Sequence, residues 1–457
     1  MKEYWYWPLL LLCLITQNVR AGSSNEMALQ TLTGQLQMLS LLPDQAALRL
    51  SLQQLQQTSS SVVPSGQLSN AEQEIAAFWQ QQGVSLPFAS LPESATPLQR
   101  AIALEPQRQE YQLTLNRIQY LLWLKNQPWP EIAPKGWLRP GDNHAVIPQI
   151  AQRLLWLGDL QEPQTNVYDY SEELAIAVKH FQARHGLKVD AVIGPQTLRW
   201  LNVTPQQRAT VLAQQFVSET IYRQQLPDSY ILVNVPAYEL SLVDAGKSVM
   251  QSKVIVGLPY RQTPLLQSRI SSIVLNPGWH VPRSLLRKDV LPHIRKDGNY
   301  LRDRDFLAYD AEGKVVSQTA AEWQQLARGP FPYRLVQQPG RHSALGRYKF
   351  HFDNSFDVYL HDTPEKQLFS KAERAFSSGC VRVEKADELA QWLAQHRVKD
   401  QRTWRNMQQD YHTTQWFSLK QPLAVYLVYW TAWVDAQGRA QFRDDIYHKF
   451  SSVEELR

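Results

Sequence analysis

Apolar residues recur every three or four positions through the first half of the chain, which is the spacing of one face of a helix. In residues 22–135 this pattern predicts several helices, broken by a serine-rich run near residue 60 and by prolines. No cluster of His, Asp or Glu stands out there, so we interpret the region as a helical scaffold. From about Tyr230 the pattern changes to alternation, which predicts β-strands. We therefore expect an α+β protein of several domains.

Between these regions, residues 136–205 predict a compact module of three short helices. The first helix is expected to end at Gly158, and the second to begin after Ser171, whose hydroxyl can cap a helix N-terminus. The third follows the turn at 190–195. Residues 206–227 are expected to form a linker helix.

The β-rich half opens with a predicted hairpin, because the turn-forming residues 244–247 separate two apolar stretches. Further strands are expected at 272–275, 347–352 and 356–360. The tail from Thr413 again has a strand-like pattern, with a second hairpin tip at 435–438. We place this tail in the same sheet, so residues 228–457 are predicted to be one domain.

The composition narrows the range of functions. With 457 residues, 44% hydrophobic and 19% charged, the chain is expected to fold into two to four globular domains. Its net charge of +5 is modest and it has no long Lys/Arg run, so nucleic acid is not indicated as a partner. A polymer that carries carboxylates is compatible with this charge.

The first 21 residues are interpreted as a signal peptide. Lys2 is followed by an apolar run over residues 4–15 and by a small-residue cleavage pattern ending at Ala21. That run is shorter than the roughly 20 residues that span a bilayer, so cleavage is favoured over a retained anchor. We expect export to the periplasm, with no stable transmembrane segment after cleavage.

Removal of that segment would leave Cys380 as the one cysteine, because Cys13 lies within it. A lone cysteine cannot form an internal disulfide, and a buried apolar cysteine is the alternative to a reactive one. Its neighbours Ser377, Ser378, Gly379 and Arg382 are polar or turn-forming, which favours the reactive thiol. His361 could form and hold the thiolate.

A helix is also predicted over residues 384–395. This would place Cys380 on a turn just ahead of a helix N-terminus. The positive end of the helix dipole is then expected to lower the thiol pKa from its usual value of about 8.5.

Residues 138–203 resemble a peptidoglycan-binding module of the three-helix type found on cell-wall enzymes. The matching strings are 177–182, 185–187, 190–195 and 201–202. Ala191 departs from the family, which often has glycine at this position. The resemblance implies a location near the cell wall, and retention of the module only as a packing unit is the alternative.

Residues 228–400 resemble the L,D-transpeptidases, whose catalytic domain is the YkuD type. The matching strings are Pro339-Gly340, Leu345-Gly346, Tyr359 to Thr363 and Ser377 to Arg382. The resemblance implies that Cys380 is the nucleophile and His361 its base, without metal or cofactor. It further implies an oxyanion hole from the Gly379 and Cys380 amides, and substrate contacts from Tyr359, Ser377, Ser378 and Arg382.

The group that orients the histidine is implied only by the resemblance. By resemblance a backbone carbonyl does this, so Asp362 would act through its main chain, and its carboxylate would be a surface group. Most of the family has histidine where Ser378 stands, a variation that we associate with the larger members. The position of Arg382 holds either asparagine or arginine in the family.

The resemblance implies that the chain forms 3-3 cross-links between peptidoglycan stem peptides, with release of D-alanine, and that carbapenems acylate Cys380. Other cell-wall synthases are candidate partners. Hydrolysis by a carboxypeptidase and transfer to a wall-anchored protein are alternatives, and so is a non-catalytic wall-binding scaffold. A papain-like peptidase is disfavoured, because here the histidine precedes the cysteine.

An insertion rich in basic residues interrupts the β-rich half at about 283–330. Its basic side chains are Arg283, Arg287, Lys288, His293, Arg295, Lys296, Arg302 and Arg304. Its position resembles the lid of large L,D-transpeptidases, and a basic lid suits a substrate with carboxylates. A solvated helical insertion explains the charge nearly as well.

Overall fold

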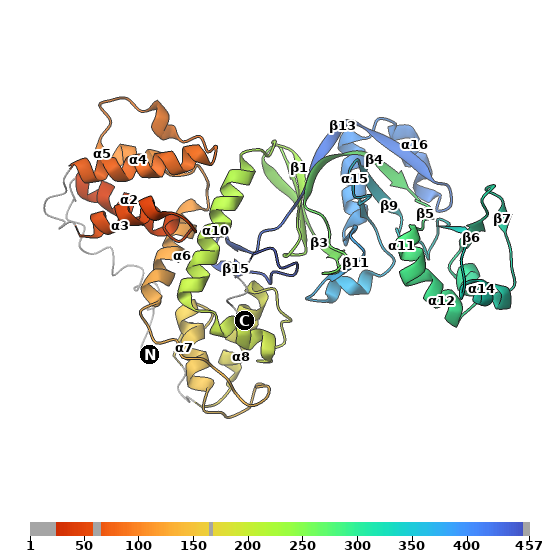
Figure 1. The fold of residues 1–457 in the computed structure, drawn as a ribbon, viewed down its shortest axis with the longest axis horizontal. Helices are drawn as coiled ribbons and strands as arrows, with labels where there is room; N and C mark the ends of the chain where they lie inside the picture. Colours follow the sequence, from red (N-terminus) through yellow and green to blue (C-terminus); the bar gives the residue numbers. More distant parts are fainter. Residues whose placement is uncertain (1–23, 58–64, 164–167, 451–457) are drawn as a thin grey trace, which may run out of the picture. The chain divides into compact units, whose positions relative to one another are not determined.

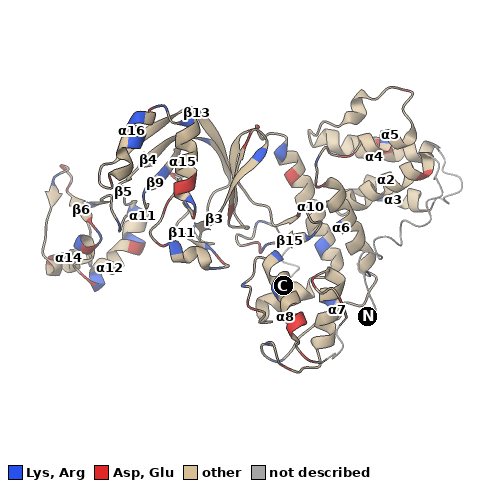
Figure 2. Ribbon diagram, turned by 180° about the vertical axis from the view of Figure 1, so that it is seen from behind, with Lys and Arg blue, Asp and Glu red and all other residues tan. Residues whose placement is uncertain are grey.

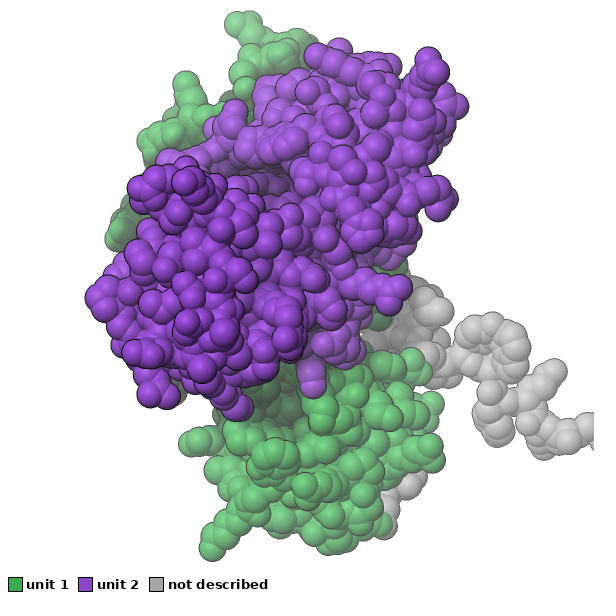
Figure 3. Space-filling view, turned by 90° about the vertical axis from the view of Figure 1, so that its right-hand side faces the viewer, with its two compact units in different colours: residues 1–225, 430–457 green, residues 226–429 purple. Residues whose placement is uncertain are grey.

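The computed structural model describes residues 24–57, 65–163 and 168–450. The predicted signal peptide and most of the serine-rich run lie outside these residues. The chain divides into two compact units, coloured separately in Figure 3. Unit 1 contains the residues up to 225 together with those from 430 onward, and unit 2 is Leu226–Tyr429. The predicted α+β architecture is confirmed.

The N-terminal part of unit 1 is helical, as predicted (Figure 1). Its elements are α2 (Ser24–Leu39), α3 (Ala46–Gln56), α4 (Ser65–Gln81), η1 (Pro87–Ser90), α5 (Pro97–Ala103) and α6 (Tyr111–Leu124). Leu32, Leu36 and Leu39 line the buried face of α2 at helical spacing. Within the described residues, none of the helices is both long enough and apolar enough to span a membrane.

The predicted three-helix module is present as α7 (Ile147–Leu157), α8 (Glu172–Arg184) and α9 (Pro195–Asn202). Gly158 ends α7 in the left-handed conformation, and Ser171 caps α8 by accepting a hydrogen bond from the Leu174 amide. Ala191 has a positive φ of 59°, which is the conformation that favours the glycine often found there in the family. The linker helix follows as α10 (Pro205–Arg223).

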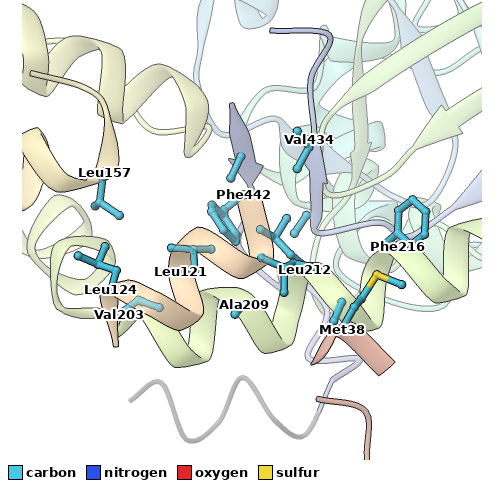
Figure 4. Close-up of a cluster of buried hydrophobic side chains, with 14 of the residues drawn as sticks. Met38, Leu121, Leu124, Leu157, Val203, Ala209, Leu212, Phe216, Val434 and Phe442 are labelled. Atoms are coloured by element: carbon cyan, nitrogen blue, oxygen red, sulfur yellow. The ribbon is translucent and has the colours of Figure 1, made fainter. Parts of the chain in front are cut away.

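The end of the chain returns to unit 1. Strands β14 (Ala432–Val434) and β15 (Ala440–Phe442) pair with each other in a separate two-stranded sheet. Val434 and Phe442 lie in one buried cluster with Leu121 of α6 and Leu212 of α10 (Figure 4). The prediction that the whole tail joins the large sheet is therefore wrong beyond residue 429. Alternation shows that a segment forms a strand, but it does not identify the partner strand.

Unit 2 is built on a nine-stranded sheet of order β11-β3-β12-β10-β9-β4-β13-β1-β2, with an additional pairing between β2, at one end of this order, and β3, next to its other end. Its strands are β1 (Tyr230–Asn234), β2 (Glu239–Asp244), β3 (Lys247–Gly257), β4 (Leu266–Leu275), β9 (Tyr348–Phe352), β10 (Leu360–His361), β11 (Ala375–Ser377), β12 (Val381–Val383) and β13 (Gln415–Val428). The predicted hairpin at 244–247 is confirmed, whereas the strand expected at 356–360 is reduced to β10.

Outside residues 279–337, the α-helices of unit 2 follow β12. They are α15 (Ala386–Arg397) and α16 (Gln401–Asn406), with single turns at η3 (Lys366–Ser370) and η4 (Met407–Gln409). Helix α15 packs against β13 and β9 (Figure 1). Its acidic residues Asp387 and Glu388 lie in the first turn, where the helix dipole favours negative charge.

Residues 279–337, which we call the insertion, form a small folded layer of their own between β4 and β9. Its elements are β5 (Trp279–His280), α11 (Arg283–Leu285), η2 (Leu286–Val290), α12 (Leu291–Lys296), α13 (Tyr300–Asp303), β6 (Phe306–Tyr309), β7 (Val315–Val316), α14 (Ala320–Leu326) and β8 (Arg334–Gln337). Leu291, Ile294, Trp323 and Leu335 belong to a separate hydrophobic core. Lys and Arg lie on its helices (Figure 2). The insertion is thus a packed element with its basic residues outside the core.

Candidate active site

The two candidate catalytic residues lie on neighbouring strands of the large sheet. Strand β10 pairs in parallel with β12, with His361 opposite Arg382, and the Val381 amide donates to the Tyr359 carbonyl over 3.1 Å. Adjacent strands lie about 4.8 Å apart, and alternate residues share a face. Cys380, two positions before Arg382, therefore lies on the face that carries His361. The pairing brings together two residues that the sequence separates by a loop.

The His361 ring is held by a backbone carbonyl. Its Nδ1 lies 2.5 Å from the carbonyl oxygen of Asp362, so Nδ1 carries the proton and Nε2 is left as an acceptor. The side chain is buried, and burial, with a smaller effect of the Arg382 charge, lowers the pKa of His361 to about 3. The imidazole is consequently neutral at physiological pH.

The Asp362 carboxylate has other partners. It accepts hydrogen bonds from the Arg347 amide at 2.8 Å and from Lys366 Nζ at 2.6 Å. This geometry agrees with the expectation that Asp362 faces the histidine through its main chain. The carboxylate, however, is more than a surface group, because its side chain is only 14% exposed.

The thiol of Cys380 is partly buried and forms no disulfide. Burial raises its pKa, and hydrogen bonds with Tyr359 and the charges of Lys349 and Arg382 oppose this effect only in part. The expectation of a lowered pKa is therefore wrong. Its physical basis also fails, because β12 and a turn separate Cys380 from the N-terminus of α15.

Lys349 is a site residue that the sequence reading missed. On β9 it lies opposite His361, and its Nζ is 4.0 Å from the centre of the Tyr359 ring. The Tyr359 ring in turn meets the His361 ring edge-on at 5.6 Å. Part of its placement could be predicted from the sequence. Tyr348, Phe350 and Phe352 alternate along the predicted strand and are buried on one face, so Lys349 lies on the other face. Only the register shows which residue Lys349 faces.

The turn before Cys380 is fixed by its own hydrogen bonds. Ser377 Oγ donates to the Cys380 carbonyl at 2.5 Å and accepts from the Gly379 amide at 3.1 Å. Gly379 has a φ of 118°, which a side chain would strain. Thr263 Oγ1 donates to the Gly379 carbonyl over 2.9 Å. In this structure Ser377 therefore holds the turn, and the Gly379 amide is directed at Ser377.

The other two predicted substrate residues have charged partners. Ser378 Oγ accepts from Arg261 Nη1 at 2.8 Å. Arg382 Nη1 lies 2.5 Å from Glu365 Oε2, a carboxylate that is half exposed. The guanidinium predicted to contact substrate is thus paired with a carboxylate of the chain itself, which a substrate would have to replace.

Two family models match the chain. Residues 228–404 match the model described as "L,D-transpeptidase catalytic domain", and this segment contains the insertion, both candidate catalytic residues and every strand of the large sheet except β13. This segment is an L,D-transpeptidase domain. Residues 143–201 match the model described as "Putative peptidoglycan binding domain" and coincide with helices α7 to α9. Both matches agree with the resemblances read from the sequence.

A curated protein of Haemophilus influenzae, named "Putative L,D-transpeptidase", is 38% identical over 224 residues. The match covers 49% of this chain and 45% of the relative, so the matched segment spans less than half of that protein.

Solved structures of other L,D-transpeptidases are also similar. The catalytic domain from E. faecium, acylated by ertapenem, is 10% identical to this chain, with a TM-score of 0.23. The match covers 45% of this chain and 99% of the E. faecium chain. The enzyme from Stackebrandtia nassauensis is 14% identical and covers 66% of this chain and 97% of that one, with a TM-score of 0.25.

The L,D-transpeptidase domain offers no obvious metal centre. Among the described residues, no group of three or more His, Cys, Asp or Glu side chains is arranged to hold a metal ion. One face of the sheet in this domain carries the Cys380 thiol, the neutral His361 imidazole and the cations Lys349 and Arg382. This set is suited to acyl transfer through sulfur.

Proposed function

We propose that the chain is a peptidoglycan L,D-transpeptidase that forms 3-3 cross-links through a thioester on Cys380. The observation that carries the proposal is the His361 ring, whose Nδ1 is fixed on the Asp362 carbonyl on the sheet face that it shares with Cys380. The match of residues 228–404 to the transpeptidase family supports the same reaction class.

Cys380 and His361 are both neutral before substrate binds, and this determines when the proton transfer takes place. Because the pKa of His361 is lowered and that of Cys380 is raised, an imidazolium–thiolate pair is disfavoured before substrate binds. The thiol proton moves to His361 Nε2 as sulfur attacks the carbonyl of the third stem residue. The oxyanion is stabilised by the Gly379 and Cys380 amides, the former turning away from Ser377.

Collapse of this intermediate breaks the peptide bond to the terminal D-alanine. Its amine takes the proton from His361, which leaves a thioester on Cys380. The side-chain amine of a diaminopimelate in a neighbouring stem then attacks the thioester and gives up a proton through His361. Sulfur leaves as the thiol, and the product is a 3-3 cross-link.

The proposed location, substrates and partners are consistent with this reaction. Residues 143–201 would keep the enzyme on the wall polymer, and the predicted signal peptide would place it in the periplasm. Stem peptides are its substrates, other wall synthases are candidate partners, and a carbapenem would acylate Cys380.

The proposal is tested with defined tetrapeptide muropeptides, with products and intact protein analysed by mass spectrometry. The wild type should give a dimer that weighs two substrates less one alanine. Cys380→Ala should give neither the dimer nor an acylated protein, while its circular dichroism stays that of the wild type. An acylated Cys380→Ala protein would contradict the assignment.

The same experiment separates the alternatives. Tripeptide monomers alone would show a carboxypeptidase, and product only when a wall-anchored protein is added would show a different acceptor. No reaction, with retained binding to sacculi, would show a binding scaffold.

A further inference from the structure

The loop between β3 and β4 lies against the turn that carries the nucleophile. The Leu258 amide donates to the Ser377 carbonyl at 2.9 Å, and Thr263 Oγ1 donates to the Gly379 carbonyl. The loop is tightly closed at its base, because a Cβ on Gly257 would lie 2.1 Å from the Arg261 carbonyl oxygen. Its position on the turn is therefore well determined.

Arg261 extends from this loop to two separate parts of unit 2. Its Nη1 donates to Ser378 Oγ, two positions before Cys380. The same guanidinium forms a two-pronged pair with Asp289 of η2 in the insertion, with Nη1–Oδ2 at 2.6 Å and Nη2–Oδ1 at 3.0 Å. One side chain thus joins the nucleophile turn to the insertion.

This pair differs from an ordinary surface ion pair. Exposed pairs contribute little, because water screens them and flexible side chains lose entropy. The side chains of Arg261 and Asp289 are 17% and 42% exposed, and the fork geometry of the guanidinium matches the carboxylate. The exposed pair Arg302–Asp303 in the same insertion, with side chains 76% and 55% exposed, provides a contrast.

Asp289 also determines what Arg261 can do. With both of its terminal nitrogens on Asp289, the guanidinium is neutralised locally, and the same Nη1 also donates to Ser378. The arrangement suits a residue that holds two elements together.

We propose that Arg261 is a positioning residue for acyl transfer, which couples the placement of the insertion to the geometry of the Cys380 turn through Asp289 and Ser378. This inference rests on the proposed transpeptidase function. Substrate acylation depends on both elements, because the stem peptide must be held while sulfur attacks. Alkylation by a small reagent such as iodoacetamide needs only the thiol.

The test is a double-mutant cycle of Arg261→Gln, Asp289→Asn and both together, with Asp303→Asn of the exposed pair as the matched control. Asp289→Asn should raise the KM for tetrapeptide acylation about tenfold and leave iodoacetamide alkylation of Cys380 within twofold of wild type. Arg261→Gln should raise KM and also lower kcat, since it releases Ser378 as well. The double variant should be no worse than Arg261→Gln, because both changes remove one shared interaction.

Additive effects in the cycle, or wild-type kinetics in Arg261→Gln, would overturn the inference. Hydrogen exchange followed by mass spectrometry gives a second readout that needs no substrate. In Arg261→Gln, exchange should increase both in η2 and in residues 375–380, but in neither for the control. Unchanged exchange overturns the inference on its own, whereas a wild type that never acylates overturns only the proposed function.

Discussion

Replacing Gly346 by alanine tests whether the backbone around His361 is as tightly determined as the structure indicates. Gly346 has a φ of 59°, in the left-handed region. A Cβ built there would lie 2.4 Å from Asp362 Oδ2 and 2.6 Å from Asp362 Cβ. Non-bonded heavy atoms need about 3.5 Å, so Asp362 must move.

The loss of unfolding free energy expected in Gly346→Ala has two parts. An alanine in the left-handed region costs about 1–2 kcal/mol of unfolding free energy. Forcing extra atoms into a packed site adds about 1–3 kcal/mol. Gly246 at the hairpin tip is a matched control, because its φ is 75° but no heavy atom lies within 4 Å of its Cβ position. Gly246→Ala should show only the first part.

Pulsed labelling of the Cys380 thiol across a urea series, read at peptide level, measures the unfolding of unit 2 in each variant. Gly346→Ala should be less stable than Gly246→Ala by about 1–3 kcal/mol. Because the Asp362 carbonyl holds His361 Nδ1, Gly346→Ala should also slow acylation under conditions where both variants are fully folded. Equal stability and equal acylation in the two variants would refute the reasoning.

Three further predictions follow from the site and from unit 1. The rate of Cys380 alkylation should rise in one step centred above pH 8.5, with no step near pH 6–7, because the lowered pKa of His361 keeps the ring neutral there. Lys349→Met should move that midpoint upward, since the Lys349 charge favours the thiolate. Phe442→Ala should destabilise unit 1 by about 3–5 kcal/mol in urea unfolding, because the ring is 1% exposed and stacks on His185 at 5.5 Å.

Each of these has a control and a contrary outcome. Lys420→Met removes an exposed charge from the same sheet and should leave the midpoint in place. Ile176→Ala, at a position 47% exposed, should leave unit 1 nearly as stable as the wild type. An alkylation step near pH 6–7, a shared shift in both lysine variants, or equal stability of Phe442→Ala and Ile176→Ala would each contradict the corresponding argument.

The sequence pattern predicted those structural features that depend only on residues close together in the chain. The hairpin at 244–247 and the caps at Gly158 and Ser171 could be read from neighbouring residues. Contacts between distant segments could not. Lys349 faces His361 only through the β9–β10 register, and Arg261 meets a carboxylate 28 positions away.

The direction in which the pKa of Cys380 is shifted could not be predicted from the sequence for the same reason. The sequence suggested a helix N-terminus beside Cys380, but Val381 to Val383 form a strand instead. Burial then outweighs the favourable charges, and burial depends on everything packed around the site. A short alternating run of three residues is too little to distinguish a strand from a turn.

The return of β14 and β15 to unit 1 has a consequence for how the protein is made. A ribosome delivers the chain from its N-terminus, so α6 and α10 emerge long before Val434 and Phe442, which share their buried cluster. All of unit 2 must be synthesised in between. The helical unit begins to fold first and is completed last, and a nascent chain halted before residue 430 would leave apolar surface of α6 and α10 open to chaperones.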